Sequence, residues 1–385
     1  MIARPVLHNI RILDFTWVLA GPYATRLLAD FGAEVIKVQP LISSDGDDAF
    51  SRGYYNTWNR NKLGITLNLN RPEGVEIARR LSAVCDAVVE NFTPRVMANW
   101  GLDYAGLKET RPDIIMLSMS MMGHTGPWRD YIGFAPTIHA FSGLTYLTAF
   151  PDGPPLGPGF SYADHVAGLH ASLALLGALE QRRKTGEGQH IDISQVEAML
   201  GLMGDVFTGK PPVPDGNRSP LAAPHDVYPC ADGRWCALAV FTDNEWRGFK
   251  RALGGPAWAE TEKFATAAVR QQNKDDLDVQ VAAWTHGHTA AEVMSRLQEN
   301  GVPAGVVQDA AHIARDPQLK ARDFFIERPW PGYSFVDASP VRLSESPAGY
   351  RRPAPPPGRD NEYVYGQLLG LAPDEMAALR DAGVI

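Results

Sequence analysis

At 385 residues, with 45% hydrophobic and 21% charged side chains, the chain has the composition of a globular protein and is long enough for two domains. Its 36 basic and 44 acidic side chains give a net charge of −8 without a basic block, so we expect no nucleic-acid partner. The three cysteines follow no metal or disulfide spacing, and neither a signal-peptide pattern nor a membrane-spanning apolar run is present, so we expect a cytoplasmic protein with no membrane partner.

Short apolar segments alternate with helical patterns over the first third of the chain. We expect strands at 10–15, 33–38, 64–69, 86–92 and 113–120. Pro22 and Gly32 suit the two ends of a first helix, and Pro72 suits the start of a second. Residues 41–58 show neither pattern and are expected to form a loop. The alternation predicts an α/β fold, with a Rossmann-like, mainly parallel sheet covered by helices on both faces.

Ligands of such sheets bind at the carboxyl ends of the strands. The loops that begin near Thr16, Leu69, Asn91 and Ser120 are therefore the places where a site is expected. The first of these loops lacks the G-x-G-x-x-G pattern, so we do not expect a nicotinamide or flavin dinucleotide.

Residues 123–160 are rich in glycine and proline and are expected to form a surface or active-site loop. A helix then begins near Ser161, because apolar residues recur at helical spacing from 166 to 179. Asp164 lies in its first turn, where unpaired N–H groups and the helix dipole favour an ionised carboxylate. Two interpretations stay open on local sequence: Asp164 is a nucleophile, or Ser161 and Asp164 form a capping box.

A strand is expected at 189–193, followed by a helix that Ser194 opens and that runs to about residue 207. The chain then divides as follows: a large Rossmann-like domain at 1–207, a linker at 208–224, a small α+β domain at 225–324, and a C-terminal segment at 325–385 that returns to the large domain.

Several short motifs, in order and with matching spacing, resemble those of the class III CoA-transferases of the formyl-CoA transferase and carnitine-metabolism type. They are Leu13-Asp14-Phe15 with Ala20-Gly21-Pro22, 32–38, Asn61-Lys62 with 67–69, Glu90-Asn91-Phe92, and 184–189. The resemblance covers nearly the whole chain. It implies an enzyme with coenzyme A as substrate and product, no metal, and an acyl-CoA and a small carboxylic acid as its partners.

By the same resemblance, Asp164 is the catalytic nucleophile, which forms a mixed anhydride and then an aspartyl-CoA thioester. The residues expected to contact CoA are Leu19, Ala20, Leu67, Asn68, Leu69, Asn70, Asn91, Phe92, Thr93, Asn99, Phe134 and Ala135. Asn70 and Asn99 stand where family members often carry a basic residue for the CoA phosphates, so Arg71 or Arg95 is expected to substitute. Residues 216–224 also lack the glycine-rich flap of some members.

Other activities remain open. An acyl-CoA racemase or epimerase shares the fold, but such enzymes resemble Gly-His-Asp where this chain has Gly133-Phe134-Ala135, and phenylalanine cannot move a proton. A CoA-dependent lyase and a CoA-binding protein without turnover are the further alternatives. His165 and His170 lie five residues apart and do not share a helix face, so a metal pair is not expected. The family also implies an interlocked homodimer.

Overall fold

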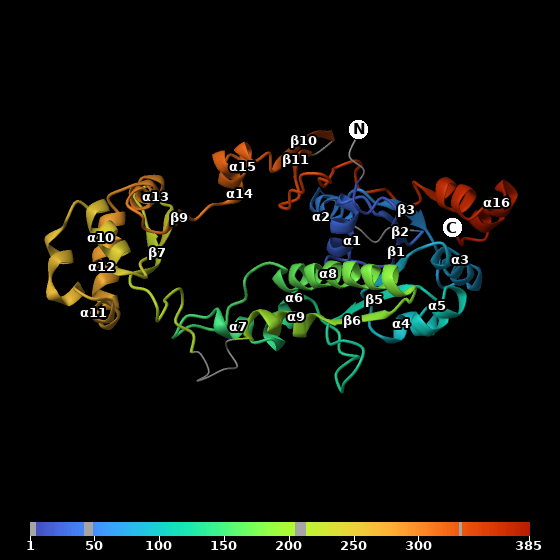
Figure 1. The fold of residues 1–385 in the computed structure, drawn as a ribbon, viewed down its shortest axis with the longest axis horizontal. Coiled ribbons are helices and arrows are strands. Elements are labelled where there is room, and N and C mark those ends of the chain that lie inside the picture. The colour runs from blue at the N-terminus through green and yellow to red at the C-terminus, as the bar shows by residue number, and fades with distance from the viewer. Residues whose placement is uncertain (1–4, 42–48, 205–212, 331–332) are drawn as a thin grey trace. The chain divides into compact units, whose positions relative to one another are not determined.

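The computed structural model describes residues 5–41, 49–204, 213–330 and 333–385, and the chain separates into two compact units (Figure 1). Unit 1 takes Met1–Leu147, Leu156–Pro212 and Ala321–Ile385, whereas unit 2 takes Thr148–Pro155 and Val213–Lys320. Unit 1 is therefore built from both ends of the chain. Among the described residues, no helix is long and apolar enough to span a bilayer.

A six-stranded sheet forms the centre of unit 1. Its strands are β1 (Arg11–Asp14), β2 (Glu34–Gln39), β3 (Leu63–Thr66), β4 (Ala87–Glu90), β5 (Ile115–Ser120) and β6 (His190–Ser194). They lie in the order β3-β2-β1-β4-β5-β6, and every neighbouring pair is parallel. The predicted α/β fold is confirmed. The order reverses direction between β1 and β4, and this is the point at which such sheets bind their ligands.

Helices cover both faces of this sheet. One face packs against α1 (Ala20–Asp30), α6 (Ala135–Phe141), α8 (Tyr162–Thr185) and α9 (Gln195–Leu202). The other packs against α3 (Pro72–Ala83), α4 (Arg95–Asn99), α5 (Tyr104–Thr110), η4 (Glu362–Leu368) and α16 (Pro373–Asp381). Successive side chains of β1 point to opposite faces of the sheet. Ile12 is buried against the helices of the first face and Leu13 against those of the second.

Two segments expected to be loops contain helices. The helix α2 (Ala49–Asn59) begins inside 41–58 and ends one residue beyond it, and α6 and α7 (Leu144–Leu147) lie inside 123–160. Long-range bonds support α2: the Tyr55 hydroxyl donates to the Pro355 carbonyl at 3.0 Å and accepts from the Gln39 amide at 2.7 Å. Tertiary contacts therefore outweigh the weak helical propensity of this sequence.

Unit 2 combines a small antiparallel sheet with helices. The strands are β7 (His225–Pro229), β8 (Trp235–Ala239) and β9 (Ala304–Val306), and the helices include α10 (Asp243–Ala252), α11 (Ala267–Gln272), α12 (Lys274–Thr285) and α13 (Ala290–Glu299). Thr242 and Thr289 open α10 and α13 with complete capping boxes. Buried Trp246, Phe249 and Leu277 belong to its core.

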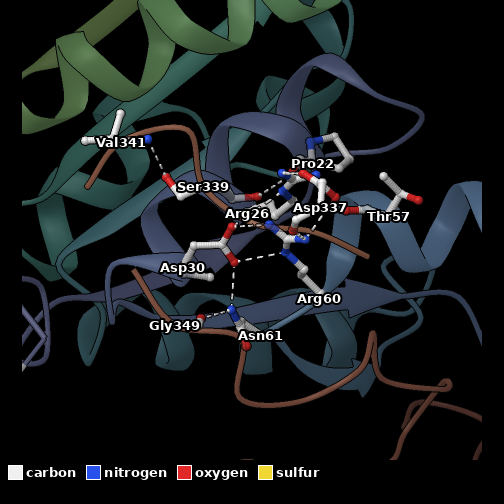
Figure 2. Close-up of polar contacts among 12 residues, drawn as sticks. Pro22, Arg26, Asp30, Thr57, Arg60, Asn61, Asp337, Ser339, Val341 and Gly349 are labelled. Atoms are coloured by element: carbon white, nitrogen blue, oxygen red, sulfur yellow. Dashed lines mark hydrogen bonds and ion pairs between the residues drawn. The ribbon is translucent and has the colours of Figure 1, made fainter. Parts of the chain in front are cut away.

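The C-terminal segment returns to unit 1 through the antiparallel strands β10 (Phe325–Trp330) and β11 (Tyr333–Asp337). Figure 2 shows the polar contacts between this segment and the rest of unit 1. The guanidinium of Arg60 donates to Asp30 at 2.7 Å and to Asp337 at 3.0 Å, and Arg26 donates to Asp337 at 2.6 Å. Asn61 adds a bond of 2.7 Å to Asp30. These mostly buried ion pairs fix the position of the returning segment on the large unit.

Candidate functional site

Asp164 lies in the first turn of α8, as predicted. The N-cap residue is Ser161, but its side chain makes no capping hydrogen bond. The expected Ser161–Asp164 capping box is therefore wrong. At the other end, Gly186 has the left-handed conformation typical of a C-terminal stop.

The carboxyl of Asp164 is partly desolvated. Burial raises its pKa to about 6, while hydrogen bonds from the backbone N–H groups of Asp164 itself and of Ala20 act to lower it. The helix start favours the ionised form, but the loss of water has the larger effect on the pKa. A carboxyl with this pKa is still mostly ionised at pH 7.

The first turn of α1 lies beside that of α8. A Cβ atom on Gly168 would come within 2.8 Å of Tyr23 Cδ1 and 2.9 Å of the Ala20 carbonyl oxygen, so glycine permits this approach. The Ser172 hydroxyl adds a hydrogen bond of 3.1 Å to the Ala24 carbonyl. This packing holds Ala20 next to Asp164, and the N-terminal N–H groups of two helices converge there.

A buried charge network supports the segment between β1 and α1. Asp14 accepts from Lys62 at 2.9 Å, from the Thr25 hydroxyl at 2.7 Å and from the Thr16 hydroxyl at 2.5 Å. Burial acts to raise the pKa of Asp14, but Lys37, Lys62 and the two hydroxyls outweigh it and hold the pKa at about 2. The charges of this network are satisfied internally, so it stabilises the loop beneath the site.

The loop itself is held from the neighbouring strand. Asn91, which follows β4, accepts a hydrogen bond of 2.9 Å from the Trp17 backbone N–H and donates one of 3.0 Å to the Trp17 carbonyl. Val18, the next residue, has a φ of 60°, which is rare for a β-branched side chain. Leu19 then forms the N-cap of α1, and Ala20 is its first residue.

An aromatic cluster lies close to Asp164. The His165 ring packs edge-on against Tyr23 and Trp58, with ring centroids 5.0 and 5.1 Å apart, and its Nδ1 lies 2.7 Å from the Ser161 carbonyl. Burial and then the negative charge of Asp164 raise the pKa of Tyr54 to about 12, so this hydroxyl is near the carboxylate. Tyr54 and Trp58 belong to α2, which the sequence analysis missed.

His139 of α6 is a second residue that the sequence analysis missed. Its Nε2 accepts a hydrogen bond of 3.1 Å from the Ala163 backbone N–H, so it satisfies an N–H group at the start of α8. Burial lowers the pKa of His139, which favours the neutral ring that this bond requires. A glycine- and proline-rich sequence gave no signal for this helix or for the contact.

The predicted CoA contacts follow strand ends or begin helices. Leu67 to Asn70 follow β3, Asn91 to Thr93 follow β4, Asn99 ends α4, and Phe134 and Ala135 lie at the start of α6. Leu19, Ala20, Leu67 and Ala135 are buried, whereas Asn70, Asn99 and Phe134 are exposed. These positions do not test CoA binding, which stays a prediction for each residue.

Arg71 and Arg95 differ as candidates for the phosphates. Arg71 precedes α3 and its guanidinium donates to the Ala382 carbonyl at 3.2 Å. Arg95 is exposed on α4, and within the described ranges it has no hydrogen-bond or ion-pair partner. In the part of the chain that the structure describes, no cluster of three or more His, Cys, Asp and Glu side chains is arranged to hold a metal.

Comparison with known proteins gives consistent results. The model of "CoA-transferase family III" matches residues 7–361. A succinyl-CoA–D-citramalate CoA-transferase of Chloroflexus aurantiacus is 37% identical over 99% of this chain and 98% of its own. A succinate–glutarate CoA-transferase of Agrobacterium fabrum is 32% identical over 95% and 96%. The crystal structure of a CAIB/BAIF family protein from Brucella suis is similar with a TM-score of 0.85 and 31% identity, covering 94% of this chain and 99% of that one.

Proposed function

Because the chain belongs to CoA-transferase family III and is an enzyme of that class, we propose that it moves CoA between two carboxylic acids through covalent intermediates on Asp164. The carboxylate oxygen attacks the carbonyl carbon of the acyl-CoA, the C–S bond breaks, and CoA leaves as thiolate. The product is a mixed anhydride between the acyl group and Asp164. No proton and no oxidant enters this step.

The remaining steps move CoA first to Asp164 and then to the acceptor acid. The thiolate attacks the Asp164 carbonyl carbon, the anhydride C–O bond breaks, and the donor acid leaves as a carboxylate. The acceptor carboxylate then attacks the aspartyl-CoA thioester and releases the thiolate again. Finally the thiolate attacks the acyl carbonyl of the second anhydride, which forms the new acyl-CoA and restores the Asp164 carboxylate.

The observation that carries this proposal is the environment of Asp164. Its side chain is mostly ionised at neutral pH but has lost part of its hydration, which makes a carboxylate a better nucleophile. The Ala20 N–H faces the same group, and the start of α1 offers partial positive charge where oxyanions develop.

For the substrates, we propose short dicarboxylic acids with succinyl-CoA as a donor, because the names of the two similar enzymes contain succinyl-CoA or succinate and a second dicarboxylic acid. The aromatic cluster supports an acyl pocket beside the nucleophile. The Trp58 indole N–H is buried and finds no acceptor among the described residues, so it can donate to the distal carboxylate of the acyl group.

We also propose a homodimer, and a cytoplasmic location as expected from the three free, buried cysteines. Leu169, Leu173 and Leu176 form an exposed apolar stripe along α8, and Leu173 is 70% exposed. Three leucines at i, i+4 and i+7 are typical of a helix face that a partner covers. Light scattering should give the mass of a dimer, and Leu173→Glu should shift it toward the monomer.

A transfer assay separates the alternatives. The enzyme, succinyl-CoA and a panel of dicarboxylic acids should yield a new acyl-CoA, and Asp164→Asn should abolish its formation. Asp374→Asn is the control, since it changes another first-turn aspartate, on α16. A racemase would exchange the α-proton for solvent deuterium without net transfer. Phe134, which is 61% exposed and cannot carry a proton, argues against that activity.

A further inference from the structure

Val18 marks a strained point in the backbone between β1 and α1. Its φ of 60° places a β-branched residue in the left-handed region, a backbone conformation that is strained for such a side chain. Such a conformation persists only when the surrounding contacts impose it. The Val18 side chain is 42% exposed, so burial of that side chain does not supply the constraint.

The residues on either side of Val18 are fixed by different means. Thr16 is anchored because its backbone N–H and its hydroxyl donate to Asp14 at 2.8 and 2.5 Å, while Lys37 donates to its carbonyl. On the other side, Gly21 lies against Thr16, where an added Cβ would come within 2.3 Å of the threonine Cβ. Between these anchors, the Trp17 peptide groups decide the path of the chain.

Both backbone groups of Trp17 are bonded to one side chain. The Asn91 amide accepts from the Trp17 N–H at 2.9 Å and donates to the Trp17 carbonyl at 3.0 Å. The Trp17 side chain is 53% exposed, so this amide clamp is the contact that fixes its backbone. Glu90 holds the turn that carries Asn91, because its carboxylate accepts from the Phe92 N–H at 2.7 Å.

We propose that Asn91 is a positioning residue for the reaction at Asp164: its amide holds Trp17 and Val18 in the conformation that directs the Ala20 N–H toward the Asp164 carboxylate. The inference rests on the proposed function of Asp164. It differs from a direct CoA contact, because the amide oxygen and nitrogen of Asn91 are both engaged with the backbone of Trp17.

The test compares Asn91→Ala and the isosteric Asn91→Asp with the unmodified enzyme. In Asn91→Asp the acceptor for the Trp17 N–H remains, but the donor is lost and a carboxylate faces the Trp17 carbonyl. Asn273→Ala is the matched control, because it also removes two amide–backbone bonds, of 2.9 and 3.3 Å, but in unit 2. If Asn91→Ala does not fold, the same measurements on Asn91→Asp decide the question.

The first readout is the ionisation of Asp164 in the free enzyme, followed by 13C NMR of labelled aspartate and assigned by its loss in Asp164→Asn. Loss of the hydrogen bond from the Ala20 N–H should raise the midpoint of the Asp164 titration from about pH 6 by about one pH unit. Tyr54 and Tyr23, the tyrosines of α2 and α1 near this site, stay neutral in this range because burial raises both pKa values. The signal reports the carboxyl itself, and His165 is the neighbouring titratable group on α8.

The second readout is kinetic. We expect kcat to fall by about 10-fold to 100-fold in both Asn91 variants, with little change in the KM for acyl-CoA, because the lost interaction acts on the developing oxyanion. A raised KM with unchanged kcat and midpoint would overturn the inference in favour of direct CoA contact. If the Asn91 variants are less stable but keep the midpoint of the Asp164 titration, Asn91 has a structural role only and the inference is wrong.

The two hypotheses fail separately. If the unmodified enzyme transfers CoA through Asp164 but the Asn91 variants keep its midpoint and rate, this inference alone is wrong. If Asp164 forms no covalent intermediate, the proposed function is wrong, and the catalytic part of the inference falls with it. The NMR midpoint still decides whether Asn91 controls the Ala20 contact.

Discussion

Replacing Gly168 by alanine tests the packing on which the site depends. The new Cβ would lie 2.8 Å from Tyr23 Cδ1 and 2.9 Å from the Ala20 carbonyl oxygen. Because the second atom belongs to the backbone, α1 and α8 must separate by a few tenths of an ångström. Overpacking of this kind costs about 1–3 kcal/mol, and the gain in helix propensity returns up to about 1 kcal/mol.

We therefore expect Gly168→Ala to lower the free energy of unfolding by up to about 2 kcal/mol. Gly201→Ala is the control, because among the described residues no atom outside its own helix lies within 4 Å of the added Cβ, and this change should be neutral or slightly stabilising. Urea denaturation followed by circular dichroism measures both variants. CoA transfer should also fall in Gly168→Ala, since the Ala20 N–H moves away from Asp164. Equal effects of the two substitutions on stability and on transfer would refute this account of the α1–α8 packing.

Three further predictions follow from the electrostatics. The transfer rate should fall below about pH 6, because Asp164 loses its nucleophilic form on protonation; a rate that stays constant down to pH 4 would contradict the assignment. Asp14, whose pKa is lowered from 3.8 to about 2, should contribute about 2 kcal/mol of stability above pH 4, and acid unfolding should show its loss as the pH falls toward 2. Lys62→Met should destabilise the protein by about 3–5 kcal/mol at pH 7, measured by urea denaturation, because Asp14 would lose its partner at 2.9 Å inside the core.

The sequence predicted the central sheet because its strands are buried on both faces and alternate with helices. It also placed Asp164 in the first turn of a helix, since the apolar spacing after it is regular. The helix α2 was missed, because its support comes from Gln39 and Pro355, which are distant in the sequence. Local propensity carries no information on such contacts.

The ionisation of Asp164 also depends on contacts that local sequence does not reveal. The helix start is visible in the sequence, and its effect on a carboxylate has the expected direction. The desolvation that outweighs it is a tertiary effect, and neighbours such as Tyr54 come from another helix. His139, which bonds to the Ala163 N–H, lies in a segment whose glycines and prolines concealed a helix.

The proposed mechanism depends on a covalent bond between Asp164 and the substrate. We suggest mixing the enzyme with succinyl-CoA, trapping with hydroxylamine and sequencing the peptides by mass spectrometry, with Asp374 of α16 as the internal reference. Our account predicts a hydroxamate at Asp164 that depends on acyl-CoA and is missing from Asp374. A fully active enzyme whose Asp164 peptide stays unmodified would contradict it.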